Sequence, residues 1–290
     1  MKLSHGDRIA LFAPAGAVSE RELLAGIEIL ESWGLRIHIP ERIFETHRYL
    51  AGPDESRARE FRELFLSGDF KALWAARGGF GSLKILPYLK ELELTRRRSY
   101  PIIIGFSDLS LLLNHLFDRF QIPSWHAPTV TFLARLSKEA CDKLKALLLG
   151  RERFKINGLP LIQGEAEGFL CGGNLASLAS LLGTPYWPDL SGKILIIEET
   201  NEKLYRLERL FTQLALAGIF EKVSGLVIGD LCGLPPEGYL SILKEILPPD
   251  LPTGYAFKIG HFPESRAFPI GQRARLTISE GRALLFEIDK

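Results

Sequence analysis

Gly105-Phe106-Ser107-Asp108 is the segment of this 290-residue chain best suited to covalent catalysis. An apolar run at residues 101–104 predicts a strand before it, and an apolar stretch at residues 109–120 predicts a helix after it. Such a turn lifts a serine out of the sheet, and the N–H groups at the helix start can bind a developing negative charge. Ser107 is therefore a candidate nucleophile. The alternative is that Ser107 or Asp108 only caps the following helix, as both residue types often do.

A serine nucleophile needs a histidine as its base, and an acid that orients this histidine. Among the six histidines, His261 is the best placed, because it follows Gly260 at a junction between an apolar run and a turn. The alternative is that His261 is a histidine of a surface loop, where this residue type is common.

Two acids, Glu198 and Glu199, end an apolar strand predicted at residues 193–197. Neighbouring residues on a strand point to opposite faces, so at least one of the two is expected to face the ligand edge of the sheet. For the same reason they cannot flank one bond as the paired acids of a glycosidase do. The alternative is that both acids stabilise the start of the next helix.

A glycine-rich segment, Arg77-Gly78-Gly79-Phe80-Gly81, follows the strand predicted at residues 72–76 and precedes a helix. Its backbone N–H groups could hold a phosphate or an oxyanion. The segment matches neither the dinucleotide-binding pattern nor the P-loop, so a nucleotide site has little support. The alternative is a plain turn that needs glycine for positive φ.

The elements that must position these residues alternate along the first half of the chain. Apolar runs at residues 8–13, 36–40, 72–76 and 102–104 are separated by amphipathic stretches at 19–33, 54–66 and from residue 82. This alternation predicts an α/β fold with a mostly parallel sheet covered on both faces. Ligands of such sheets bind at the carboxyl ends of the strands, where the glycine-rich segment and Ser107 both lie.

A domain boundary is expected within residues 136–165, where the chain becomes charged and polar. We predict an N-terminal α/β domain over residues 1–135, a linker over 136–165 and a C-terminal α/β domain over 166–290. In the second half, a helix at 204–216 and strands at 193–197, 225–228, 274–278 and 283–288 are predicted.

Composition and charge exclude several classes of function. Lysine and arginine number 36 against 35 acidic residues, so there is no basic field to attract nucleic acid or an anionic membrane. Three dispersed cysteines, Cys141, Cys171 and Cys232, argue against a zinc site or a disulfide framework, and no metal is expected. The N-terminus lacks a signal-peptide pattern, and no segment is apolar enough to span a membrane. A soluble cytoplasmic protein that binds a small neutral or zwitterionic ligand is expected.

Several motifs of this chain resemble those of the LD-carboxypeptidase family of serine peptidases, which includes muramoyltetrapeptide carboxypeptidases and microcin C self-immunity proteins. The resemblance covers nearly the whole chain, and the ordered set of motifs is specific where a single one would not be. The motifs are Gly6-Asp7, Ala13-Pro14-Ala15, Arg77-Gly78-Gly79-Phe80-Gly81, Ile104-Gly105-Phe106-Ser107-Asp108, Gly172-Gly173-Asn174-Leu175, Ile197-Glu198-Glu199, Gly260-His261 and Pro269-Ile270-Gly271.

The resemblance implies a catalytic triad of Ser107, Glu198 and His261, and it selects Glu198 over Glu199. It implies a Rossmann-like N-terminal domain that carries the serine, a smaller swivelling-type C-terminal domain that carries the acid and the histidine, and an active site in the interdomain cleft. The substrate would be a murein tetrapeptide, cleaved between an L-configured diaminopimelate or lysine centre and the terminal D-alanine during peptidoglycan recycling. No cofactor is implied, and a homodimer is expected.

We expect two backbone N–H groups to bind the oxyanion. One belongs to Asp108, and the other to Gly79, which lies beside Gly78 in the glycine-rich segment. Arg77 is a candidate for the C-terminal carboxylate, although an ion pair is the simpler role for it. Two residues depart from the family pattern: Phe106 stands where tyrosine is more usual, and Ser265 where asparagine follows the histidine in many members. Alternative functions are hydrolysis of a microcin-like aminoacyl-nucleotide and noncatalytic ligand binding by two domains.

Overall fold

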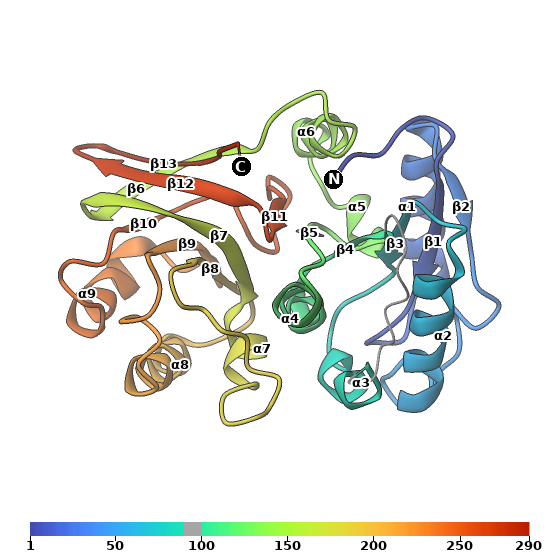
Figure 1. Ribbon diagram of the computed structural model, residues 1–290, viewed down its shortest axis with the longest axis horizontal. Coiled ribbons are helices and arrows are strands. Elements are labelled where there is room, and N and C mark those ends of the chain that lie inside the picture. Colours follow the sequence, from blue (N-terminus) through green and yellow to red (C-terminus); the bar gives the residue numbers. More distant parts are fainter. Residues whose placement is uncertain (90–99, 290) are drawn as a thin grey trace. The chain divides into compact units, whose positions relative to one another are not determined.

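The computed structural model describes residues 1–89 and 100–289, which form two compact units, residues 1–152 and 153–290. In unit 1, drawn in blue to green in Figure 1, the strands are β1 Arg8–Phe12, β2 Arg36–His38, β3 Ala72–Ala75, β4 Ile102–Gly105 and β5 Ser124–His126. Its helices are α1 Glu20–Ser32, α2 Asp54–Ser67, α3 Ser82–Leu89, the short 3-10 helix η1 Ser107–Leu109, α4 Ser110–Phe120, α5 Val130–Leu133 and α6 Lys138–Leu148.

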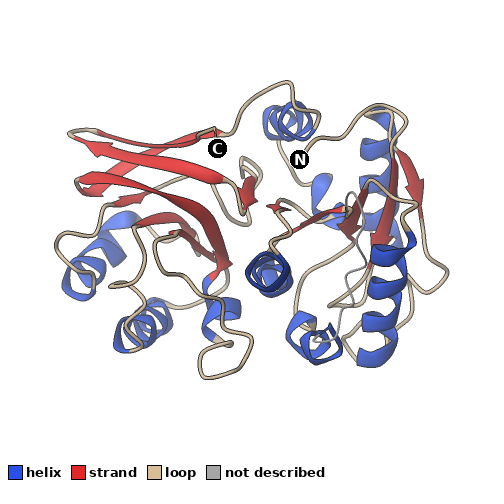
Figure 2. Ribbon diagram, in the orientation of Figure 1, coloured by secondary structure: helices blue, strands red, loops and turns tan. Residues whose placement is uncertain are grey.

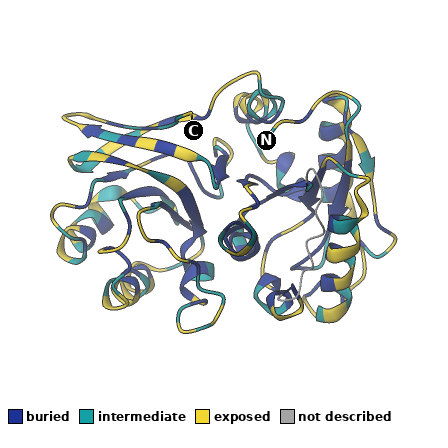
Figure 3. Ribbon diagram, in the orientation of Figure 1, coloured by how far each residue is buried: buried dark blue, intermediate teal, exposed yellow. Residues whose placement is uncertain are grey.

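The strands of unit 1 pair in the order β5-β4-β3-β1-β2, and every pairing is parallel. The central strands β3 and β4 are buried along their whole length, as Figure 3 shows in dark blue, because helices lie against the sheet. Helix α1 packs with α5, whereas α2 packs with α3 and α3 with α4. The predicted parallel α/β sheet is confirmed, and β5 is a strand that the sequence did not predict.

Unit 2 contains the strands β6 Lys155–Ile162, β7 Gly164–Asn174, β8 Ile194–Glu199, β9 Gly225–Leu231, β10 Thr253–Tyr255, β11 Phe268–Ile270, β12 Arg273–Ser279 and β13 Arg282–Glu287. Its helices are α7 Leu175–Ala179, α8 Leu204–Leu216 and α9 Pro236–Ile246. Seven of these strands close into a barrel in the order β10-β6-β13-β12-β7-β8-β9. Residues 136–165, predicted as a linker, include α6, all of β6 and the first two residues of β7.

The barrel of unit 2 has a parallel part and an antiparallel part. Strands β7, β8, β9 and β10 run parallel, whereas β6, β12 and β13 pair through antiparallel ladders. Helices α7, α8 and α9 lie together on one side of the barrel (Figure 2), where Leu175, Phe211 and Leu243 belong to one apolar core with the parallel strands. The expected α/β unit is therefore more specifically a mixed barrel, and its swivelling character stays a prediction.

No helix in residues 1–89 or 100–289 is long and apolar enough to cross a membrane.

Candidate active site

Ser107 lies on a sharp turn between β4 and α4. Phe106 is extended with φ −147°, whereas Ser107 has φ 63°, in the left-handed region that residues with a side chain rarely occupy. A conformation of this kind stores about 1–3 kcal/mol and persists only where the surrounding structure imposes it. Neither η1 nor α4 begins with a capping side chain. Helix capping, the alternative considered for Ser107, therefore does not explain this serine.

The glycine-rich loop contacts the Ser107 side chain directly. A β-carbon built on Gly78 would lie 3.0 Å from Ser107 Cβ and 3.2 Å from Ser107 Oγ. The Gly78 carbonyl accepts the Gly16 N–H at 3.0 Å, so the turn after β1 helps to fix the position of the glycine-rich loop. Gly79 has φ 101°, which favours glycine. Only a residue without a side chain allows the backbone to come this close to the serine.

Two backbone N–H groups beside Ser107 are suited to binding an anion. The Gly79 N–H donates no hydrogen bond to any residue within the described ranges. The Asp108 N–H belongs to the first turn of η1, where N–H groups lack a carbonyl partner inside the helix. These are the two donors that the sequence analysis expects to bind the oxyanion, and this role stays a prediction.

The side chain of Asp108 contacts a different helix from the one it precedes. Its Oδ2 accepts the N–H of Ser82, the first residue of α3, at 2.7 Å. Burial raises the pKa of Asp108, while the Ser82 and Gly81 N–H groups and the Arg57 guanidinium oppose this rise. Asp108 therefore ties the serine turn to the end of the glycine-rich loop.

Arg77 lies at the surface, beside the turn after β1. Its guanidinium donates a hydrogen bond to the Ala17 carbonyl. In the part of the chain that the structure describes, Arg77 forms no ion pair with an acid. The ion pair considered as its simpler role is thus not found there.

In unit 2, the two acids at the end of β8 lie in different surroundings. Glu199 Oε1 accepts hydrogen bonds from Asn174 Nδ2 at 2.9 Å and from the Thr200 N–H at 2.7 Å, and its Oε2 accepts the Ala176 N–H at 2.7 Å. Burial raises the pKa of Glu199, and these hydrogen bonds act in the opposite direction. Glu199 therefore holds the start of α7, which leaves Glu198 as the acid on the other face of the strand.

Glu198 and His261 form a buried hydrogen-bonded pair. His261 Nδ1 lies 2.8 Å from Glu198 Oε2, with Glu198 completely buried and the His261 side chain 15% exposed. Burial lowers the pKa of His261, but the Glu198 carboxylate, with smaller contributions from Glu199 and Asp230, shifts it upward overall. With Nδ1–H donating to the carboxylate, Nε2 is the ring nitrogen that can take a proton. Glu198 Oε1 is buried and has no hydrogen-bond partner among the described residues.

The loop that carries His261 is fixed by backbone contacts. Gly260 has φ 148°, and a β-carbon there would lie 2.9 Å from Asp230 Cβ. The Asp230 N–H donates to the Ile259 carbonyl at 2.7 Å. Ser265 Oγ accepts the Gly260 N–H at 3.1 Å, and Ser265 is buried. The serine that departs from the family pattern thus supports the turn next to the histidine.

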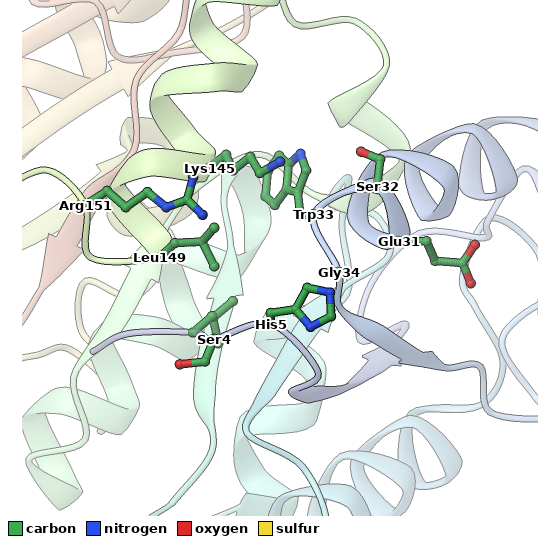
Figure 4. A pocket seen from close by; sticks show the side chains of 10 residues that line it. Ser4, His5, Glu31, Ser32, Trp33, Gly34, Lys145, Leu149 and Arg151 are labelled. Carbon is green, nitrogen blue, oxygen red and sulfur yellow. The ribbon is translucent and has the colours of Figure 1, made fainter.

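A separate cavity of about 570 Å³ lies in unit 1, at the edge where β1 and β2 begin. Figure 4 shows the His5 ring beside Gly34 there, below Lys145 and Arg151. Ligands of parallel sheets bind at the other edge, where the strands end. None of the predicted site residues lines this cavity; its lining consists of Leu3, Ser4, His5, Glu31, Ser32, Trp33, Gly34, Lys145, Leu149 and Arg151.

Two polar residues near the candidate sites were not singled out from the sequence. Arg57 is 2% exposed and shares the buried face of α2 with Phe61 and Phe65. A charged residue at a core position of an amphipathic helix is a signal that could have identified it. Asp230 lies within the stretch of β9 where the register with β8 shifts, and such irregularities are not visible in the sequence.

A serine on a strained strand-to-helix turn and a buried acid–histidine pair are the groups that serine hydrolases use. No three His, Cys, Asp or Glu side chains lie together as a metal-binding group within residues 1–89 and 100–289. Family models for the LD-carboxypeptidase N-terminal domain and C-terminal domain match residues 9–127 and 167–276. The chain belongs to the LD-carboxypeptidase family, and thus to the hydrolases.

Individual relatives agree with this family. The probable murein peptide carboxypeptidase of Bacillus subtilis is 30% identical over 98% of this chain and 92% of its own length. The murein tetrapeptide carboxypeptidase of Pseudomonas aeruginosa is 32% identical, covering 93% and 92%. The microcin C7 self-immunity protein MccF of Escherichia coli is 26% identical, covering 93% and 90%. The crystal structure of muramoyltetrapeptide carboxypeptidase from Oxalobacter formigenes superposes with a TM-score of 0.85, 28% identity, and coverage of 97% and 99%.

Proposed function

We propose that this protein is a serine-type LD-carboxypeptidase that removes the terminal D-alanine from a murein tetrapeptide. The family and the names of the relatives support the reaction class. The observation that carries the assignment is the 2.8 Å contact between His261 Nδ1 and the buried Glu198 carboxylate, because a carboxylate at Nδ1 fixes the tautomer in which Nε2 can act as a base.

In the proposed reaction, His261 Nε2 takes the Ser107 proton while Oγ attacks the carbonyl carbon of the L,D-amide bond. The N–H groups of Asp108 and Gly79 bind the oxyanion of the tetrahedral intermediate. Collapse of this intermediate breaks the C–N bond, and the imidazolium protonates the amine of D-alanine as it leaves. Water, deprotonated by the same histidine, then hydrolyses the acyl-enzyme and regenerates Ser107.

Arg77 is the proposed partner of the free C-terminal carboxylate of the substrate. Its side chain is exposed at the strand-end edge and forms no ion pair with the described acids, so its charge is available to a ligand. The homodimer and the cytoplasmic location stay predictions. Light scattering of the purified chain tests the first, and cell fractionation tests the second.

The proposal is tested by measuring D-alanine released from tetrapeptides that end in L-Lys–D-Ala or diaminopimelate–D-Ala. Ser107→Ala and His261→Ala should each lower kcat by a factor on the order of 10⁴ to 10⁶, because members of a triad act as a unit. His47→Ala, in an exposed loop, is the matched control and should keep wild-type turnover. Full activity of a folded Ser107→Ala variant would refute the serine mechanism.

Hydrolysis of a microcin-like aminoacyl-nucleotide is the second candidate, favoured by the similarity to MccF over 93% of this chain. Comparing kcat/KM for the tetrapeptide with that for an aminoacyl sulfamoyl adenosine distinguishes the two activities. If neither is hydrolysed and a fluorophosphonate fails to label Ser107 in a chain that still binds either compound, the noncatalytic alternative is favoured instead.

A further inference from the structure

A buried guanidinium lies behind the Ser107 turn. Arg57, on the inner face of α2, is 2% exposed, although arginine is seldom buried unless it is paired and hydrogen bonded. An apolar side chain of similar size could fill the same space without the penalty of desolvating a charge. The contacts that retain a charge here are therefore informative.

The Arg57 guanidinium binds the ends of three separate loops. Its Nε donates to the Gly52 carbonyl at 3.2 Å, and its Nη1 donates to the Gly81 carbonyl at 3.1 Å and to the Pro14 carbonyl. Its Nη2 forms an ion pair with Asp54, at the start of α2. One side chain thus connects the turn after β1, the turn before α2 and the glycine-rich loop after β3.

Asp108 holds the same loop from the other side. Its carboxylate accepts the N–H of Ser82, which directly follows the carbonyl that Arg57 binds on Gly81. The positive charge of Arg57 also favours the carboxylate form of Asp108. The glycine-rich loop is therefore anchored at both groups of the peptide unit that joins Gly81 to Ser82.

This anchoring leaves the loop little freedom to move. A β-carbon on Gly81 would lie 2.9 Å from both Arg57 Nη1 and Ala15 Cα. At the other end of the loop, the Gly78 backbone contacts the Ser107 side chain. A shift at Gly81 is thus transmitted over two residues to the N–H of Gly79, which directly follows the glycine that lies against Ser107.

We propose that Arg57 and Asp108 are a pair of positioning residues that hold the Gly78–Gly79 backbone against Ser107 and so set the geometry of the oxyanion site. Neither side chain touches the substrate. The inference depends on the proposed function, because it concerns how the reaction at Ser107 is assisted. Preorganised donors stabilise a transition state only if they need no rearrangement as the oxyanion forms.

The test compares Arg57→Ala, Arg57→Lys and Asp108→Asn with the matched control Lys84→Ala. Lys84 forms the other ion pair of Asp54, at 2.6 Å, and its hydrogen bond to the glycine-rich loop comes from its backbone N–H, which donates to the Gly81 carbonyl and is kept in Lys84→Ala. We expect Arg57→Ala to lower kcat on the order of a hundredfold, similar to the loss of one oxyanion donor, with little change in KM. Arg57→Lys should lose less, Asp108→Asn roughly tenfold, and Lys84→Ala should remain near wild type.

Two further readouts separate positioning from general stability. Guanidinium chloride, well below denaturing concentrations, should restore part of the kcat of Arg57→Ala, whereas sodium chloride at equal ionic strength should not. Amide hydrogen exchange at Ser82 should be faster in Asp108→Asn and in Arg57→Lys, while exchange in the core strand β3 should be unchanged. The exchange experiment requires no substrate.

The outcomes divide clearly. If folded Arg57→Lys and Asp108→Asn keep the wild-type kcat and the wild-type exchange at Ser82, the positioning role is wrong. It is also wrong if each loss of activity equals the loss of folded protein. If wild-type protein releases no D-alanine although exchange at Ser82 responds as expected, the proposed function fails and the structural pairing stands.

Discussion

The surroundings of Ser107 and those of the Glu198–His261 pair differ in what holds the reactive groups in place. At Ser107 the backbone dominates: a residue at φ 63°, a glycine-rich loop close to the side chain, and the N–H groups at the start of η1. At the pair, side-chain charge dominates, through a 2.8 Å hydrogen bond inside the protein. A site built from backbone conformation should be sensitive to added atoms, and a site built from charge should be sensitive to its removal.

The largest effect is expected from removing the charge of Glu198. Glu198→Gln keeps the size of the side chain but no longer fixes the tautomer of His261 or stabilises the imidazolium, so kcat should fall about 10⁴-fold. Turnover of the murein tetrapeptide measures this loss. Glu199→Gln is the matched control, because it changes the neighbouring acid on the opposite face of the same strand.

Glu199→Gln should keep kcat within a few-fold and should instead lower the free energy of unfolding. An amide NH₂ would replace one carboxylate oxygen that now accepts a backbone N–H, and a buried unsatisfied donor costs about 1–3 kcal/mol. Urea denaturation of both variants measures this difference. If Glu199→Gln lost as much turnover as Glu198→Gln, the division of roles between the two acids would be wrong.

An intermediate effect is expected from adding one methyl group beside Ser107. Gly78→Ala would place a carbon 3.0 Å from Ser107 Cβ, so the serine or the loop must shift. We expect kcat to fall roughly a hundredfold, in the range of misplacing a catalytic group by about an ångström. Thermal denaturation should show near-native stability, because Gly78 does not have positive φ.

Gly79→Ala is the control for Gly78→Ala, because it introduces backbone strain without a close contact to Ser107. A β-carbon there has no neighbour nearer than 3.8 Å, but φ 101° is strained for any residue with a side chain. This variant should lose about 1 kcal/mol or more of stability and less turnover than Gly78→Ala. Equal losses of turnover in the two variants would mean that contact with Ser107 is not what requires glycine at position 78.

The sequence predicted the surroundings of Ser107, which the backbone holds in place, better than those of the Glu198–His261 pair, which charge holds in place. Continuous apolar runs identified β1, β3 and β4, and the turn at Ser107 followed from its place between a strand and a helix. By contrast, alternation along β8 showed that Glu198 and Glu199 face opposite sides but not which of them meets a histidine 63 residues later. The closed barrel and the contacts of Arg57 depend on pairings between distant segments, which local patterns do not encode.

The smallest effect is expected in the pH dependence, where the two kinds of surroundings also differ. Glu198 raises the pKa of His261 against the effect of burial. The acid limb of kcat/KM should therefore have its midpoint above the ordinary histidine value of about 6.5. The free energy of unfolding should change with pH in the opposite direction to activity. Because the pKa of His261 is raised by folding, this histidine stabilises the protein fully at pH values below its unfolded-state pKa, and the contribution is lost as pH rises through its folded-state pKa.

NMR titration of the His261 ring measures this pKa directly and does not depend on turnover. Glu198→Gln should move the midpoint down the most, and Asp230→Asn should move it down less, following the order of their contributions. Gly78→Ala should leave it unchanged, since it adds no charge and alters only the surroundings of the serine. If Gly78→Ala shifted the His261 titration as far as Asp230→Asn does, the backbone around Ser107 would influence the charge of His261. The two regions would then not be held in place independently of each other.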